Sequence, residues 1–496
     1  MRWTKFLLPR IEYIFLAATF WGIAASGPKI LNLDGDLPRH LLVGQLTLQT
    51  AKVSTIDIFS FRTAGFPSYP HEWLSQVLLV IPYKIFGLDG VVLMVASIIT
   101  LTFAIVYKSA RQVSSPLIAL IFTALALSAS TIHILPRPHI FTYLFIAIWI
   151  YHMEKVSSGQ SQAWWIFPVL MLLWVNIHGM FLLGILIWLA YVVGKMFDLG
   201  LSNWWQSKES RHIFTGGVVS IPVTFLSPSG PGIWKAVLEL GSNVYITSRI
   251  PEYQPANFHL PGTWPFLLIL ALLIIGLALN TTRLPWSSIF LLVGFSMLAL
   301  YSSRMIPVFA IVAAPIAAGV FFTWLQAEKP QSKFVKTETF IQTTEAQSGG
   351  LVWIVITVLV VTGLFASGQS IDPQHKENVF DKQMFPIDAV QWLKNHPQKG
   401  HMLNDFNWGG YILLETWPEY QIFMDGHTHI YGEALTREYE QVVTISQGWE
   451  SVLKKYQIEW AILPTSSMLA EALSEDGWKT LYNDKNAVIL RETQMP

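Results

Sequence analysis

Acidic and histidine side chains recur between strongly hydrophobic stretches of this sequence. Asp34 and Asp36 are separated by one glycine, and His40 follows four residues after Asp36. Two carboxylates at this spacing can bind one divalent cation such as Mg²⁺ or Mn²⁺, or one of them can act as a general base. Gly35 lets the backbone turn so that both carboxylates face one point. The plainer interpretation is a solvated loop turn.

A second pair of polar residues, His71 and Glu72, opens segment 73–86. Both can project into a cleft, but Glu72 can equally stabilise the positive end of a helix dipole, with Trp73 as an interfacial anchor. Further on, prolines on both sides of Arg137 hold it in an extended turn beside His139. A rigid arginine there suits an anionic lipid headgroup, although a snorkelling arginine among lipid phosphates fits the same pattern.

Three more candidates lie later in the chain. His178 falls in a tight hairpin, where a histidine is more often structural, and Glu252 falls in a long loop that can close over a cleft. Arg304 stands between two hydrophobic segments joined by almost no loop, and a charge in that position favours a functional role over snorkelling.

The composition places all these residues in a membrane protein. Of the 496 residues 52% are hydrophobic and only 13% are charged, whereas soluble domains carry about a quarter charged residues. The formal net charge is zero, so no attraction to nucleic acid is indicated. Cysteine is absent, which excludes disulfides, thiolate metal sites and cysteine nucleophiles.

Recurring apolar segments predict about eleven membrane crossings. The first, 11–31, follows Arg2, Lys5 and Arg10 and indicates a retained signal anchor. The other predicted spans are 88–107, 116–134, 139–152, 163–177, 179–197, 213–227, 264–280, 286–303, 305–325 and 351–370. Segment 73–86 is short and contains Pro82 and Lys84, so we interpret it as a helix at the membrane interface. If it crosses instead, every later loop changes sides.

The distribution of Lys and Arg orients these spans. With the N-terminus cytoplasmic, the basic clusters from Lys108 and Arg111 through to Lys329 and Lys333 all fall inside, as the positive-inside rule requires. The candidate acids, histidines and arginines then gather at the outer surface. The sequence therefore predicts a multi-pass protein of the cell membrane with an active site on its extracytoplasmic side.

Domain boundaries follow from the same pattern. Residues 1–371 are predicted to form an α-helical polytopic module, in which 32–87 is the first outer loop and 326–350 a flexible inner linker. Residues 372–496 are predicted to form a small α/β extracytoplasmic domain. Its expected helices are 386–395 and 434–443, and its expected strands are 421–424, 460–463 and 487–490.

Several short motifs together resemble the GT-C superfamily of membrane glycosyltransferases, which includes protein mannosyltransferases, aminoarabinose transferases and oligosaccharyltransferases, and in particular uncharacterised bacterial members. The motifs are Asp34-Gly-Asp36 with His40, Asp57-Ile-Phe-Ser60, Gly65-Phe-Pro67, His71-Glu72-Trp73-Leu74, Arg137-Pro138, Asn176-Ile-His178-Gly179, Asn404-Asp405-Phe-Asn-Trp408-Gly409-Gly410-Tyr411, Asp425-Gly426 and Tyr431. The resemblance covers most of the chain. It departs where many members carry adjacent acids, because Gly35 splits the acids here.

The resemblance implies a hexosyl- or pentosyltransferase that uses a polyprenyl-phosphate-linked sugar donor. It implies an inverting transfer in which Asp34 or Asp36 activates the hydroxyl of an extracytoplasmic lipid, glycan or protein acceptor. Arg137 and Arg304 would stabilise the departing phosphate, with help from His71 or His178. The split acids leave open which is the base, and a divalent cation is permitted but not required.

Three other functions remain open at this stage. A transporter or flippase would place polar groups near the bilayer midplane, whereas these lie at one surface. An O-antigen-type polymerase or ligase also uses outer arginines, but the paired acids favour a GT-C enzyme. A non-enzymatic assembly protein with a large outer domain is the third.

Overall fold

The computed structural model describes residues 7–33, 35–280, 283–369, 371–372 and 377–493. The chain forms two compact units, and neither is one continuous stretch. Unit 1 comprises residues 1–26, 92–230 and 250–376, and unit 2 comprises 27–91, 231–249 and 377–496. Unit 2 therefore contains residues 377–496 of the predicted soluble domain together with the whole of the predicted first loop, 32–87.

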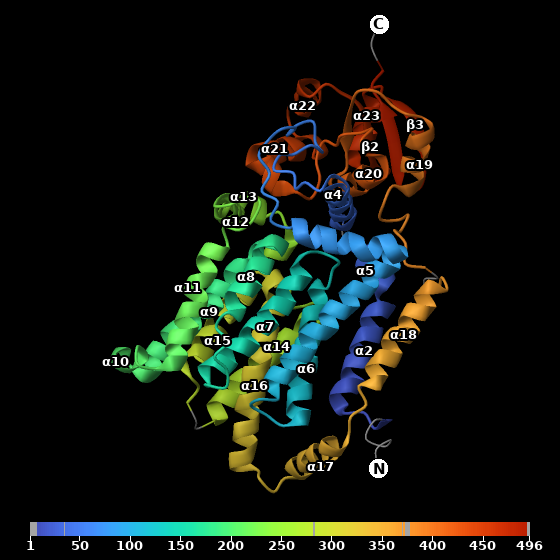
Figure 1. Ribbon diagram of the computed structural model, residues 1–496. Coiled ribbons are helices and arrows are strands. Elements are labelled where there is room, and N and C mark those ends of the chain that lie inside the picture. The colour runs from blue at the N-terminus through green and yellow to red at the C-terminus, as the bar shows by residue number, and fades with distance from the viewer. Residues whose placement is uncertain (1–6, 34, 281–282, 370, 373–376, 494–496) are drawn as a thin grey trace. The chain divides into compact units, whose positions relative to one another are not determined.

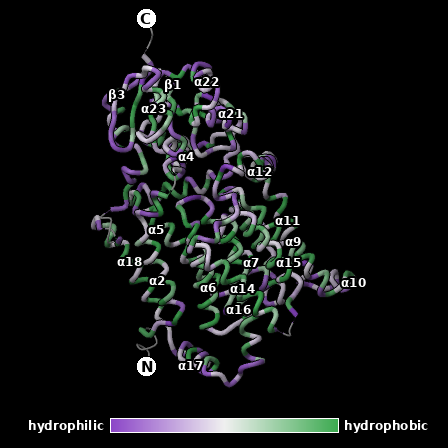
Figure 2. The backbone as a smooth tube through the Cα atoms, turned by 180° about the vertical axis from the view of Figure 1, so that it is seen from behind, coloured by the Kyte–Doolittle hydropathy of each residue, from purple (hydrophilic) through white to green (hydrophobic). Residues whose placement is uncertain are grey.

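Unit 1 is built from helices, most of them hydrophobic in sequence (Figure 1). They are α2 (Ile11–Ala25), the later part of α5 (Trp73–Ala110), α6 (Pro116–Ser130), α7 (His139–Ser157), α8 (Ile166–Ile177), α9 (Leu182–Leu199), α10 (Leu201–Trp204), α11 (Lys208–Val223), α14 (Trp264–Leu279), α15 (Trp286–Tyr301), α16 (Ile306–Glu328), α17 (Lys333–Gln347) and α18 (Val352–Ala366). Lipid offers no hydrogen bonds, so only an element that satisfies its own backbone suits such sequences. Figure 2 shows hydrophobic residues along most of these helices.

Five helical stretches in the described part of the chain are long and apolar enough to cross a membrane: 73–110, 116–133, 179–199, 261–279 and 303–328. Four further apolar helices, α2, α8, α15 and α18, have between 10 and 17 residues. Each predicted span is thus helical over most of its length, while the count of eleven crossings stays a prediction. The first predicted span, 11–31, is interrupted, because α2 ends at Ala25 and a separate helix α3 occupies Gly27–Leu31.

The predicted break between segment 73–86 and the following span coincides with a kink in α5. The backbone leaves helical geometry at Phe86 and at Gly87, whose φ is +59°. A residue that has a Cβ is strained at a left-handed φ, whereas glycine is not. Gly87 therefore lets two helical stretches join here without a loop.

The polar segment 326–350 is not an unstructured connection. It contains α17, whose N-cap Ser332 accepts a hydrogen bond from the backbone N–H of Val335 through its side chain. A side-chain oxygen at this position satisfies one of the unpaired N–H groups that open every helix. The predicted inner linker at 326–350 thus includes a capped helix, and its flexibility stays a prediction.

Unit 2 contains a four-stranded mixed sheet of order β1-β2-β4-β3. Its strands are β1 (His401–Asn404), β2 (Ile458–Pro464), β3 (Lys479–Asn483) and β4 (Ala487–Arg491), of which β1 and β2 are parallel and the other pairs antiparallel. Its helices are α3, α4 (Asp36–Thr50), the first part of α5, α12 (Gly232–Ser242), α13 (Val244–Thr247), α19 (Ile387–Asn395), α20 (Gly409–Thr416), α21 (Thr428–Val443), α22 (Trp449–Lys455) and α23 (Met468–Glu475). The predicted helices and two of the three predicted strands match these elements.

The third predicted strand, 421–424, does not form. Only Ile422 makes a bridge, to Ser60, and its N–H donates to the Phe59 carbonyl at 3.0 Å. The segment is β-like in composition, but its backbone partner is a short piece of the first loop rather than a sheet strand. Strands β1 and β3 were not predicted.

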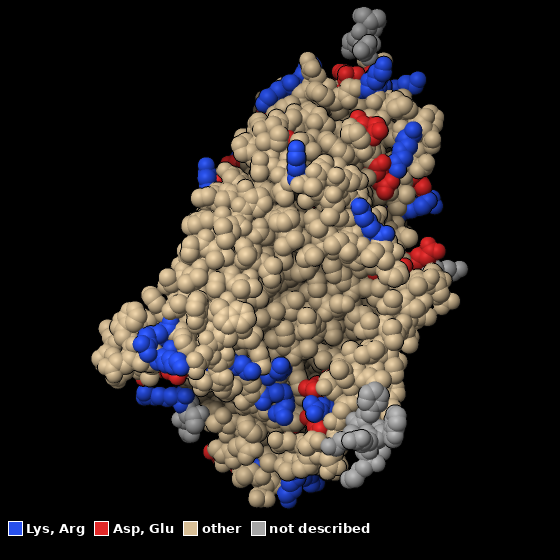
Figure 3. Space-filling model, viewed as in Figure 1, with Lys and Arg blue, Asp and Glu red and all other residues tan. Residues whose placement is uncertain are grey.

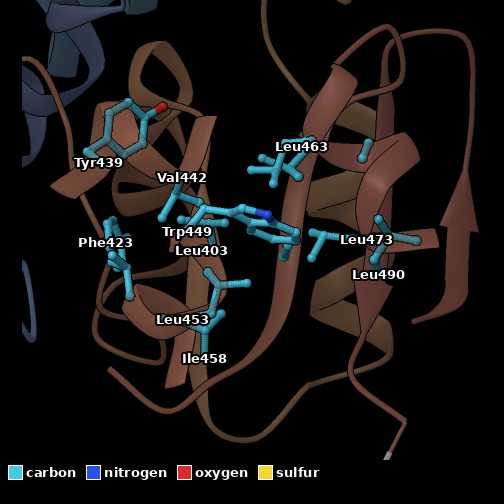
Figure 4. Close-up of a cluster of buried hydrophobic side chains, with 14 of the residues drawn as sticks. Leu403, Phe423, Tyr439, Val442, Trp449, Leu453, Ile458, Leu463, Leu473 and Leu490 are labelled. Atoms are coloured by element: carbon cyan, nitrogen blue, oxygen red, sulfur yellow. The ribbon is translucent and has the colours of Figure 1, made fainter. Parts of the chain in front are cut away.

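Two hydrophobic clusters form the core of unit 2. The larger surrounds Trp449, with Leu453, Leu463 and Leu490 nearby (Figure 4). The other contains Leu42 of α4 and Phe59 of the first loop together with residues of the sheet domain. The first loop thus shares a core with the C-terminal residues, which gives its polar side chains fixed positions within unit 2.

Candidate functional site

Arg304 is the centre of a polar cluster in unit 1. It lies in the short 3-10 helix η5 (Ser303–Met305), which leads into α16. Its Nη1 is 3.0 Å from Oε1 of Glu252 and 3.0 Å from the hydroxyl of Tyr253, and its Nη2 is 3.3 Å from Nε2 of His178. Glu252 and Tyr253 come from another 3-10 helix, η3 (Pro251–Tyr253). Three polar partners therefore fix the direction of this guanidinium.

Glu252 also brings the second predicted arginine into the cluster. Its Oε2 is 3.7 Å from Nη1 of Arg137 and 3.4 Å from Nε2 of His133. Burial alone would raise the pKa of Glu252, but Arg304, His133 and Arg137 outweigh it, and the pKa lies below its ordinary value. Glu252 is therefore ionised at neutral pH and holds the two arginines together.

His178 orients Arg304 through a chain of buried hydrogen bonds. The indole N–H of Trp174 donates to Oγ1 of Thr142 at 2.9 Å, and Oγ1 is 2.8 Å from Nδ1 of His178. Since Arg304 can only donate, Nε2 of His178 accepts and Nδ1 must carry the proton. His178 is thus neutral, and its ring is held between Thr142 and the guanidinium.

His139 is occupied by the protein itself. Its Nε2–H donates to the carbonyl of His133 at 3.0 Å, and the two rings stack with centroids 4.3 Å apart. Its side chain is buried. It supports the turn that carries Arg137. We call Arg137, His139, His178, Glu252 and Arg304, with His133 and Tyr253, the arginine cluster.

Among the described residues, the arginine cluster brings two guanidinium groups to the carboxylate of Glu252. Arginines suit phosphate because their planar N–H groups match its oxygens. Five members of this cluster were predicted as site residues from the sequence, whereas no motif pointed to Thr142, which holds His178 in place.

The predicted acid site falls in unit 2. Asp34 lies outside the described residues. Asp36 is the first residue of α4, and its carboxylate lies against Gly426 so closely that a Cβ on that glycine would overlap Oδ1. Gly410 likewise leaves no room beside the carbonyl of Gly35, where a Cβ would come within 2.7 Å of the oxygen. Two glycines of the C-terminal segment thus allow the start of α4 to approach.

A buried ion pair anchors the same helix. Arg39 is 6% exposed and donates through Nη1 to Asp425, which is 1% exposed, while its Nη2 lies 3.8 Å from Asp57. Asp57 in turn accepts from the hydroxyl of Thr63 at 2.6 Å. The hydroxyl of Tyr431 donates to Asp425 at 3.4 Å. The motif residues Asp57 and Asp425 are therefore employed in holding Arg39.

His40 is also built into the structure of unit 2. It is buried, and the side-chain amide of Gln76 donates to its Nδ1 at 3.2 Å. That bond puts the ring proton on Nε2. Gly44, one turn later, allows α4 to touch the backbone of Gln76. A role for His40 in substrate binding stays a prediction, and it would have to use Nε2–H.

His71 and Glu72 lie in a cluster of histidines. Nδ1–H of His71 donates to the carbonyl of Tyr69 at 2.9 Å, and Nε2 is 3.7 Å from Oε1 of Glu72. The ring of His71 is 5.3 Å from that of His429, which is 4.0 Å from that of His427. Nε2 of His429 is buried without a hydrogen-bond partner. Neither His427 nor His429 was predicted as a site residue, although the His-x-His pair directly after the Asp425-Gly426 motif was a usable signal.

These two histidines make unit 2 sensitive to acid. Burial, then the neighbouring positive groups, hold the pKa values of His427 and His429 well below 6.5. The unfolded chain takes up protons below about pH 6.5, and the folded unit does not. As the pH decreases below about 6.5, the free energy of unfolding should therefore decrease by at most about 1.4 kcal/mol per pH unit for each histidine.

Burial raises the pKa of Asp425, so at still lower pH the folded state holds that proton more tightly and offsets part of the loss. We expect thermal unfolding of the full chain to move to lower temperature between about pH 7.5 and 5.5. The His429→Gln protein should show a shallower pH dependence, and His396→Gln, at an exposed position, should not. Equal slopes in all three proteins would contradict this account.

A divalent cation finds no ready site in the described part of the chain. There, no group of three or more histidine, aspartate or glutamate side chains is arranged to hold a metal ion. Because Asp34 is not among the described residues, its pairing with Asp36 around Mg²⁺ or Mn²⁺ stays a prediction.

Comparison with known proteins shows which solved structures share the fold of this chain. Neither a family model nor a curated protein matches the sequence. Three oligosaccharyltransferase structures from Archaeoglobus fulgidus, one of them of the protein AglB, resemble the chain. The complex with an inhibitory peptide and a dolichol-phosphate has a TM-score of 0.60 at 11% identity, over 98% of this chain and 75% of that one.

The two other oligosaccharyltransferase structures have the same fold as this chain. The apo form has a TM-score of 0.59 at 12% identity, and the form tethered to an acceptor peptide with an NVT sequon has 0.57 at 13% identity. Both matches cover 97% of this chain and 74% of theirs. At such identities the likeness establishes the fold alone. The chain therefore has an AglB-like fold.

Proposed function

We propose that this protein is a membrane glycosyltransferase. It moves a hexosyl or pentosyl group from a polyprenyl-phosphate-linked donor to a lipid, glycan or protein acceptor on the extracytoplasmic side of the cell membrane. The AglB-like fold supports this class of reaction. AglB has been captured with a dolichol-phosphate and a peptide, which makes a lipid phosphate and an acceptor reasonable partners here.

The arginine cluster is the observation that carries the proposal. Arg137 and Arg304 share Glu252, and His178 orients Arg304 within a unit built from hydrophobic helices. When a sugar leaves a lipid phosphate, negative charge grows on the phosphate oxygens. Fixed guanidinium groups stabilise that charge without having to reorganise during the reaction.

The proposed transfer inverts the configuration at the sugar. Asp34 or Asp36 takes the proton from the acceptor hydroxyl as its oxygen forms a bond to the anomeric carbon. The bond from that carbon to the phosphate oxygen breaks, and the lipid phosphate leaves with the electron pair. His71 and Glu72 lie in the same unit as Asp36 and are the proposed contacts for sugar or acceptor hydroxyls.

Deletion of the gene tests the function. We expect the deletion strain to lose a sugar from an extracytoplasmic glycan, lipid or protein and to accumulate the lipid-linked donor. Mass spectrometry of both fractions measures these changes, and the wild-type gene supplied in trans should reverse them. Unchanged glycans and unchanged lipid-linked sugars would refute the proposal. Donor that accumulates only on the cytoplasmic side would instead indicate a flippase.

A further inference from the structure

A cavity of about 280 Å³ lies in unit 1 between α6, α14, α16 and α17. Its lining is apolar and includes Ile121, Phe122, Leu272, Phe321, Trp324 and Phe334. Cavities lined only by apolar groups do not hold water. Because α14 and α16 belong to stretches long and apolar enough to cross a membrane, alkyl chains are the available neighbours.

Helix α17 is fixed against this cavity by a buried carboxylate. Glu338 is 5% exposed, and its oxygens accept from the backbone N–H groups of Leu117 at 3.3 Å and Ile118 at 3.0 Å. These donors open α6 and have no partner within their own helix, and the helix dipole favours a negative charge there. Phe334 precedes Glu338 by one helical turn, so the same contact positions its ring in the wall of the cavity.

The rest of α17 has the character of a helix at a membrane surface. Lys333 and Lys336 are exposed, as is Lys329 just before the helix, and Phe340 is 70% exposed. Among the described residues none of these lysines makes an ion pair. Exposed lysines beside an exposed aromatic ring are typical of helices that bind anionic lipid surfaces. Figure 3 shows Lys and Arg side chains at the end of the unit where α17 lies.

We propose that this cavity binds one alkyl chain of an anionic phospholipid, whose phosphate is held by Lys333 and Lys336. The apolar lining favours the alkyl chain of the lipid, and the lysines of α17, which make no ion pair within the described part of the chain, favour its negatively charged headgroup. A helix of another protein needs a groove for a cylinder about 10 Å across, which a cavity of about 280 Å³ does not provide.

Thermal unfolding of the full chain in detergent micelles tests the site, with added phosphatidylglycerol compared with phosphatidylcholine. We expect phosphatidylglycerol to raise the unfolding temperature of the wild-type protein more. The difference should vanish in Lys333→Glu/Lys336→Glu but persist in Lys208→Glu, which changes an exposed lysine of the same unit. Ile121→Trp should fill the cavity and remove the effect of both lipids.

Native mass spectrometry supplies a second measurement that does not depend on unfolding. The wild-type protein should retain one phosphatidylglycerol, and the double lysine variant should retain none. An equal loss in Lys208→Glu would show general charge attraction and overturn the proposal. So would an undiminished lipid effect in Ile121→Trp. A dimer that dissociates only in Ile121→Trp would assign the cavity to a second copy of the chain instead.

Discussion

Asp36→Asn should reduce sugar transfer by at least about 10²-fold, because an amide cannot take the proton of the acceptor hydroxyl. Insertion into the membrane and folding should not change, since Asn occupies the same volume and also tolerates the first turn of a helix. Transfer measured on the purified protein with lipid-linked sugar gives the rate. Asp34→Asn belongs beside it, because the sequence leaves open which acid is the base.

A second variant moves the carboxylate without removing it. Gly426→Ala places a methyl group where Oδ1 of Asp36 lies, so the side chain must rotate away. We expect a loss of transfer with Asp36 still present. Asp476→Asn, at an exposed site of the same unit, is the matched control and should transfer normally. Full activity in both Asp34→Asn and Asp36→Asn would remove these acids from the mechanism.

Asp425→Ala should destabilise unit 2 by about 3–5 kcal/mol, because it leaves the Arg39 guanidinium buried without its closest partner. Asp57 cannot replace that partner, since it lies 3.8 Å from Nη2 and is already bound to Thr63. The expected result is a lower unfolding midpoint, followed by the fluorescence of Trp449 and its neighbours in the core of unit 2.

The double variant Arg39→Met/Asp425→Leu separates charge from packing. Replacing a buried ion pair by apolar groups of similar volume is often nearly neutral. We therefore expect the double variant to recover much of the stability that Asp425→Ala loses. If Asp425→Ala has the same unfolding midpoint as the wild type, the buried pair contributes nothing to stability and the anchoring of α4 has another cause.

The arrangement of the cores illustrates what sequence patterns can predict. Continuous apolar segments located most helices of unit 1, because a chain in lipid has few alternatives to a helix. The sequence pattern also located β2 and β4, which are short runs of mostly apolar residues between turns. It did not find that 421–424 pairs with the first loop, because that partner lies more than 350 residues away in the sequence.

Candidate residues divided in the same way. Residue type and neighbouring prolines selected Arg137, and the absence of a loop selected Arg304. No pattern linked either to Glu252, whose carboxylate both contact. Nor did any pattern show that Asp425 serves Arg39, or that His178 accepts a hydrogen bond from Arg304.

The sequence by itself determined that this is a helical membrane protein with an α/β segment at its C-terminal end, because burial in lipid and backbone hydrogen bonding act on each segment locally. Only the tertiary structure decided which charges meet. Ion pairs join residues distant in the chain, and the low dielectric of a buried site makes each partner's position, rather than its place in a motif, decide its role.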